Sequence, residues 1–227
     1  MKRKFYTEAA YLFGLILLAF GAAMMERADL GMSMVVAPAY LVYLKVSAIL
    51  PWFSFGMAEY CFQALLLLVL AVVLQRFQRR FLFSFVTAFV YGNILDAAMK
   101  CIGLLPGDGW GLRLVFFVMG MLLSAVGVSL LFHTYIAPEV YELFVKEISA
   151  KYGRNIHAVK TVYDCCSCMA AVLMSFAFFG FLQFQGVKAG TILCALVNGS
   201  LIGLFSRFFE RHFDFCDGFH FRDFVSR

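Results

Sequence analysis

The sequence holds two pairs of polar residues, each four positions apart within an otherwise apolar stretch: Glu59 and Gln63, and Lys160 and Asp164. On a helix, side chains at this spacing lie on one face, one turn apart. Ionisable groups in an apolar helix usually face a partner or a cavity, because exposing them to lipid is costly. Each pair therefore predicts either a contact that sets the register of neighbouring helices or a binding contact for a polar substrate or ion.

Three further polar residues lie in or beside apolar runs and are second candidates for a central site: Asn93, Asp96 and Asn198. Asp96 is one helical turn from Lys100, so we expect these two side chains to pair. Each asparagine adjoins a glycine, a residue type that lets helices approach closely. For the two asparagines we therefore favour hydrogen bonds that support packing over a role in lining a central site.

Cysteine and histidine patterns predict no catalytic site, cofactor or metal. On a helix, Cys165 and Cys168 share one face, but no second cluster completes a four-ligand zinc site. Thiols within apolar runs behave as small hydrophobic groups. Because no Ser/His/Asp set, Cys/His set or phosphate-binding loop is visible, we do not expect an enzyme.

The composition places these residues in a membrane protein. Hydrophobic residues make up 63% of the 227 residues and charged residues 15%, and the mean hydropathy is +0.86. Soluble domains carry about 25% charged residues, so this chain has too few charges for a water-exposed surface. We expect contact with a lipid bilayer. The net charge of +5 is modest, and in a membrane protein the distribution of Lys and Arg reports orientation rather than a nucleic-acid partner.

Six uncharged runs approach the length of about 20 residues that a membrane-spanning helix needs. The two shortest reach that length if Glu59 and Asp96 lie near helix ends or face the bundle interior. Because backbone groups in lipid must bond internally, the fold class is all-α, with six transmembrane helices. The N-terminal run is expected to be an uncleaved first helix. The runs are 9–25, 60–75, 81–95, 114–132, 165–187 and 189–206.

The distribution of Lys and Arg predicts the orientation. If the N-terminus is cytoplasmic and the chain crosses six times, only 5 of the 19 Lys and Arg residues face outside, and the other 14 are cytoplasmic. This asymmetry follows the positive-inside rule. We therefore expect a multi-pass protein of the cell membrane with both termini in the cytoplasm. The five outer residues are Arg27, Lys45, Lys100, Arg113 and Lys188.

Two proline-led segments are expected to form short helices that do not cross. The segment APEVYELFVKEIS (137–149) places its apolar residues on one helical face and its charges on the other. It is expected to lie at the interface or to dip into the bundle. The segment APAYLVYLKVS (37–47) has a single charge, Lys45, and a crossing by residues 32–47 stays open, although the charge count argues against it.

The two halves of the chain resemble each other in order and spacing. A glycine-containing span, a polar break, a short helix and two further spans occur in each half, at offsets of 100 to 107 residues. Three crossings per half place the halves in opposite orientations, as 3+3 inverted repeats. We predict one structural domain with repeats at 1–106 and 107–208. An aromatic and basic cytoplasmic tail is expected at 209–227.

Several motifs carry a family resemblance. They include ADLGMSMVVAPAYL (28–41), FVYGNILD (89–96), IAPEVYELFVKEIS (136–149) and GTILCALVNGSLIGLFSRF (190–208). With these motifs, nearly the whole chain resembles the YczE/YyaS/YitT-type bacterial membrane proteins. Met34 departs from the pattern, since similar proteins often have proline there. The resemblance implies an integral membrane protein of no established activity that is usually assumed to be a transporter.

These observations predict a membrane transporter or channel for a small polar or anionic solute, working where the repeats meet. The proline-led helix starts carry partial positive charge that suits an anion or a polar group. Three alternatives stay open: a binding subunit that needs an energising partner, an intramembrane enzyme, and a structural or regulatory membrane protein. The sequence also leaves open the substrate, carrier or channel action, and homo-oligomerisation.

Overall fold

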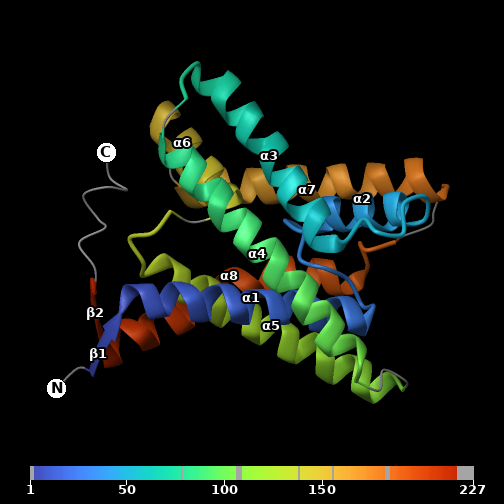
Figure 1. Cartoon of the computed structure of the whole chain (residues 1–227), viewed down its shortest axis with the longest axis horizontal. Coiled ribbons are helices and arrows are strands. Elements are labelled where there is room, and N and C mark those ends of the chain that lie inside the picture. The colour runs from blue at the N-terminus through green and yellow to red at the C-terminus, as the bar shows by residue number, and fades with distance from the viewer. Residues whose placement is uncertain are drawn as a thin grey trace.

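The computed structural model describes residues 3–77, 79–105, 109–137, 139–154, 156–181 and 185–218. Within these ranges the chain forms eight helices and two short strands (Figure 1). Six helices are long and apolar enough to cross a membrane, so the protein is an all-α, multi-pass membrane protein. The six are α1 (Thr7–Ala28), α3 (Phe55–Leu74), α4 (Arg79–Gly103), α5 (Trp110–Phe132), α7 (Ile156–Phe179) and α8 (Ala189–His212).

The two proline-led segments form short helices, α2 (Ala37–Ser47) and α6 (Val140–Tyr152), of 11 and 13 residues. Both fall short of the roughly 17 residues that a crossing requires. Each packs on a long helix of the other half of the chain, since α2 contacts α7 and α6 contacts α3. The short helices therefore link the two halves.

Helix ends differ from the uncharged runs where charged residues continue a helix. The fifth long helix, α7, begins at Ile156 rather than at 165, and therefore includes Lys160 and Asp164. It ends at Phe179, before Gly180, whose φ of +104° is incompatible with a right-handed helix. The third long helix likewise continues through Asp96 to Gly103. Charge alone does not end a helix when the side chain has a partner.

The first helices of the two halves, α1 and α5, pack closely along glycines. A Cβ atom on Gly21 would lie 2.7 Å from the Gly120 carbonyl oxygen, and one on Gly127 would lie 2.7 Å from the Gly14 oxygen. These distances leave no room for a side chain, so the glycines permit backbone contact. The pairing of Gly14 with Gly127 and of Gly21 with Gly120 makes the two helices antiparallel.

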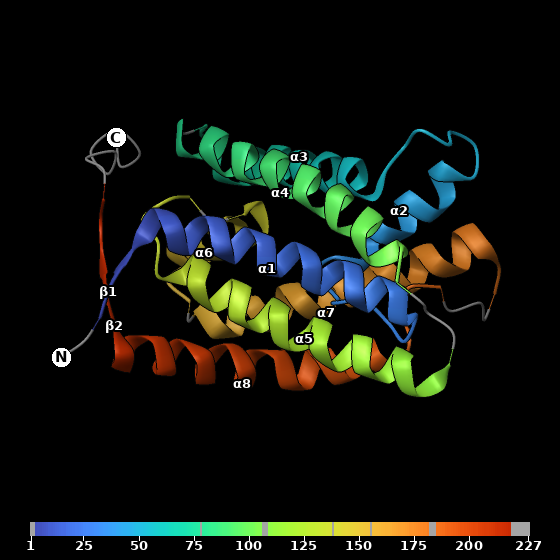
Figure 2. The ribbon, with the colours of Figure 1, turned by 60° about the horizontal axis from the view of Figure 1, so that its bottom comes forward.

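The long helices form layers around this central pair. Figure 2 shows α3 and α4 side by side over α1, and α8 along the opposite side of α5. The main core lies between α1, α4 and α5 and includes Leu15, Tyr91, Leu95 and Phe117. A smaller core joins α3 and α4 to the short helix α6, through residues such as Leu70 and Val140.

The two ends of the described chain meet in a short parallel pair of strands, β1 (Arg3–Tyr6) and β2 (Phe213–Cys216) (Figure 1). The Phe5 ring contacts the rings of Phe213 and Phe215 at centroid distances of 5.5 and 5.8 Å. The alternating aromatic residues after α8 thus form a paired strand rather than only an interfacial tail. Residues 219–227 of the predicted tail lie outside the described ranges.

Candidate functional site

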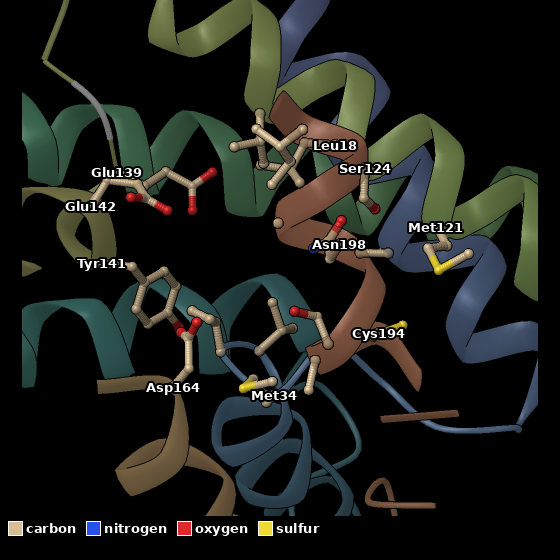
Figure 3. A pocket seen from close by; sticks show the side chains of 18 of the residues that line it. Leu18, Met34, Met121, Ser124, Glu139, Tyr141, Glu142, Asp164, Cys194 and Asn198 are labelled. Carbon is tan, nitrogen blue, oxygen red and sulfur yellow. The ribbon is translucent and has the colours of Figure 1, made fainter. Parts of the chain in front are cut away.

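A cavity of about 290 Å³ lies inside the bundle, between α1, α4, α5, α6, α7, α8 and the break that precedes α2. Its wall includes residues 32–36 from that break and Glu139, Tyr141 and Glu142 from the start of α6. The beginnings of both short helices therefore border one space. Figure 3 shows Tyr141 and Asp164 on one side of it and Asn198 on the other.

One ammonium group serves two carboxylates in the cavity wall. Lys160 Nζ is 3.2 Å from Glu142 Oε1 and 3.8 Å from Asp164 Oδ1. Among the described residues that line the cavity, Lys160 is the sole basic residue, whereas Glu139, Glu142 and Asp164 are acidic. With all four groups ionised, the wall carries a net negative charge.

Behind the wall, Glu59 and Gln63 are fully buried and hold the start of α6. The Tyr141 hydroxyl donates a hydrogen bond to Glu59 Oε2 at 2.8 Å, and the Val140 amide donates to Gln63 Oε1 at 3.1 Å. The Val140 bond satisfies one of the free N–H groups at a helix start. Position 63 thus fixes where the short helix enters the bundle.

The sequence pattern was wrong about the position of Glu139. Its helical face was expected to be polar, yet the side chain is only 7% exposed and lines the cavity. Glu147, on the same predicted face, is also buried, with Arg76 Nη2 3.8 Å away. Both are covered because α6 dips between α3 and α7 instead of lying on the surface.

Burial also changes the acidity of Glu139. Loss of hydration, reinforced by the negative charges of Glu59 and Glu142, raises the pKa of the Glu139 carboxyl well above its ordinary value. Its Oε2 accepts a 3.5 Å hydrogen bond from Gln63 Nε2, whereas Oε1 has no hydrogen-bond partner among the described residues.

The remaining predicted site residues divide into two groups. Asn198 lines the cavity, and its Oδ1 is buried without a hydrogen-bond partner in the described part of the chain. Asn93 is outside the lining, and its Nδ2 donates to the Phe89 carbonyl within α4 at 2.7 Å. Asn93 therefore acts within its own helix.

Asp96 is also outside the cavity lining and caps a neighbouring helix. Its Oδ1 accepts from the Gly56 amide at 2.7 Å, and its Oδ2 accepts from the Ser54 hydroxyl. Ser54 is the N-cap of α3, so Asp96 completes that helix start. The expected pairing with Lys100 is wrong: no ion pair joins these two described residues.

Tyr141 and the break at residues 32–36 were not among the sequence-predicted site residues. The available signal was the proline-led start of each short helix, since irregular backbone at membrane depth occurs where it lines a cavity. That signal marks the two segments, but it does not say which of their side chains turn inward.

Comparison with known proteins identifies the family of this chain. Residues 5–207 match DUF6198, a family of unknown function. The chain belongs to the DUF6198 family. No curated protein and no solved structure matches it. Because membership in DUF6198 specifies no activity, a functional assignment depends on the geometry of the cavity.

Proposed function

We propose that the protein is a membrane transporter that carries a small polar solute through the cavity between its two halves. The observation behind this proposal is the position of the cavity, at the beginnings of two short helices that do not cross the bilayer. Discontinuous elements of this kind form the binding sites of many secondary transporters, near the bilayer midplane. The resemblance to YczE/YyaS/YitT-type proteins supports this proposal. We also propose that both termini lie in the cytoplasm.

Reciprocal contacts support an inverted-repeat arrangement. Gly120 and Gly127 each follow their counterparts in the first half, Gly14 and Gly21, by 106 residues. The contact of Gly14 with Gly127 has its counterpart in the contact of Gly120 with Gly21. A two-fold relation exchanges partners in this way.

A second pair of contacts repeats the pattern at the short helices. Gln63 on α3 accepts a hydrogen bond from the start of α6, and Ser167 on α7 donates one, at 2.9 Å, to the Met34 carbonyl before α2. Ser167 lies 104 residues after Gln63, within the offsets of the sequence repeat. Related halves of this kind allow a central site to open alternately to each side of the membrane.

The charge of the wall favours a cationic solute over an anionic one. Among the described lining residues, three carboxyl groups face one ammonium group. Gln63 already occupies the first amide of α6, which reduces that helix start's capacity for an anion. The rings of Tyr91 and Tyr141 and several methionines complete the wall. Aromatic faces attract cations, so we propose a small organic cation as the substrate class.

Uptake of radiolabelled solutes into proteoliposomes tests this function. Guanidinium and tetramethylammonium are cationic probes, and acetate is the anionic control. We expect cation uptake that Asp164→Asn lowers about tenfold, because a lost charged contact is worth about 1.5 kcal/mol. Glu210→Gln, an exposed change on α8, should leave it unaltered. Cation uptake no larger than that of protein-free vesicles would count against transport of this class.

A further inference from the structure

Two buried carboxyl groups share one amide in the interior. Gln63 Nε2 is 3.4 Å from Glu59 Oε2 and 3.5 Å from Glu139 Oε2. Glu59 is completely buried and Glu139 nearly so, and neither takes part in an ion pair within the described residues. The cluster thus brings two acids together with no cation of its own.

The cluster also lacks donors. Tyr141 and Gln63 supply hydrogens to the two Oε2 atoms, but both Oε1 atoms are buried without a hydrogen-bond partner among the described residues. Two carboxylates that share a buried site do not both ionise readily, because each charge raises the cost of the other. A proton on one of them removes a charge and provides the missing donor.

We propose that Glu59 and Glu139 hold one proton between them and release it when an organic cation enters the cavity. This inference rests on the proposed transport function and names its coupling ion. Glu139 is the connecting group, because it belongs to both the pair and the cavity wall. The carboxyl O–H bond breaks, the proton passes to water, and the cation replaces its charge, so the net charge of the site is unchanged.

The other described ionisable groups around the pair do not supply a positive charge in place of this proton. Lys160 already contacts Glu142 and Asp164, which leaves the pair without an ammonium group from the described part of the chain. The nearby phenols stay neutral around neutral pH, since an unperturbed tyrosine titrates at about pH 10. Lys160 and Asp164 line the same cavity as Glu139. The titratable groups that face the pair are Tyr11 on α1, Tyr91 on α4, Tyr141 and Glu142 on α6, and Tyr163 on α7.

Infrared spectroscopy tests the proton directly. At about pH 7, the detergent-purified protein should show the carbonyl stretch of a buried protonated carboxyl group. Glu139→Gln and Glu59→Gln each leave a single carboxyl group that no longer shares a proton, and each should lower or shift the band. Glu210→Gln should leave it intact. A wild-type spectrum without the band, or one unchanged in both pair variants, would overturn the proton site.

Proton release tests the coupling. Guanidinium and tetramethylammonium do not titrate near neutral pH, so protons that appear in a weakly buffered solution come from the protein. We expect about one proton per bound cation, release that is lost in Glu139→Gln, and unchanged release in Glu210→Gln. Retained folding of each variant is checked by size-exclusion profile.

The outcomes separate this inference from the proposed function. Cation uptake without proton release would overturn the exchange and leave transport standing. Absence of uptake for every cation probe would overturn transport and exchange together, while the infrared band would still decide whether the pair is protonated. Proton release that persists in both Glu59→Gln and Glu139→Gln would assign the proton to another group and refute the proposal.

Discussion

The Tyr141 hydroxyl donates a 2.8 Å hydrogen bond to Glu59 Oε2, which fastens the short helix α6 to the first turns of the long helix α3. The bond joins residues 82 positions apart, one from each half of the chain. It also fixes the orientation of the Tyr141 ring in the cavity wall.

Replacing Tyr141 by phenylalanine removes this bond. The buried Glu59 Oε2 then keeps only the longer hydrogen bond from Gln63 Nε2. We expect a loss of about 1–3 kcal/mol in unfolding free energy, measured by thermal unfolding in detergent. Tyr152→Phe, on the exposed end of the same helix, is the matched control and should change stability little. Equal shifts for the two variants would contradict a specific role for the Tyr141 hydroxyl.

The stability of the protein should fall as the pH rises above the usual titration range of a glutamate. Burial, with the charges of Glu59 and Glu142, raises the pKa of Glu139, so the folded state keeps a proton that the unfolded chain has lost. The free energy of unfolding therefore decreases as the pH rises from the ordinary glutamate pKa to the raised one, and the loss is complete once the pH is above the raised pKa.

Thermal unfolding as a function of pH measures this effect. Glu139→Gln should flatten the decline in melting temperature, because the amide does not titrate. Glu210→Gln should retain the decline. Superimposable profiles for the wild type and Glu139→Gln would show that Glu139 titrates alike in the folded and unfolded states.

Removing the Lys160 ammonium group from the wall should strengthen cation binding. In Lys160→Met, Glu142 and Asp164 lose their shared partner, and a cation in the cavity loses a like charge nearby. We expect a roughly tenfold higher affinity for guanidinium, since such an interaction is worth on the order of 1 kcal/mol or more, measured by calorimetry. Lys146→Met, exposed on α6, is the control. Weaker guanidinium binding in Lys160→Met would favour an anionic or neutral substrate.

The close contact of α1 with α5 should tolerate no added methyl group. A Cβ atom at Gly21 would lie 2.3 Å from Ser124 Oγ and 2.7 Å from the Gly120 oxygen. We expect Gly21→Ala to lower unfolding free energy by about 1–3 kcal/mol, the usual range for overpacking. Gly203→Ala, which meets nothing within 4 Å, should be neutral or slightly stabilising, and similar losses for both would contradict the tight interface.

Labelling of single cysteines tests the opposite orientation of the two halves. Lys45→Cys and Lys151→Cys, at the ends of α2 and α6, should react with a membrane-impermeant reagent from opposite sides of the membrane. Glu210→Cys should react from the same side as Lys151→Cys. All three require a background without the seven native cysteines. Labelling of positions 45 and 151 from one side would refute the inverted arrangement.

The local sequence was sufficient for the helices, because hydrophobic length and proline position are properties of neighbouring residues. Six spans follow from the apolar runs, and two short helices follow from the proline-led segments 37–47 and 137–149, although the second helix begins at Val140. The same local information paired Lys160 with Asp164, one turn apart, and the structure has that pair at 3.8 Å. It failed for Asp96, whose partners lie 40 and 42 residues away.

The amino-acid sequence by itself determined the class of protein, the number of crossings and the polar residues that a membrane interior has to accommodate. Tertiary structure alone decided which of them meet: it buried Glu139 beside Glu59, placed Asn198 on the cavity wall and left Asn93 outside it. The physical reason is that hydropathy averages over a segment, whereas the inward or outward direction of one side chain depends on how α6 settles between α3 and α7.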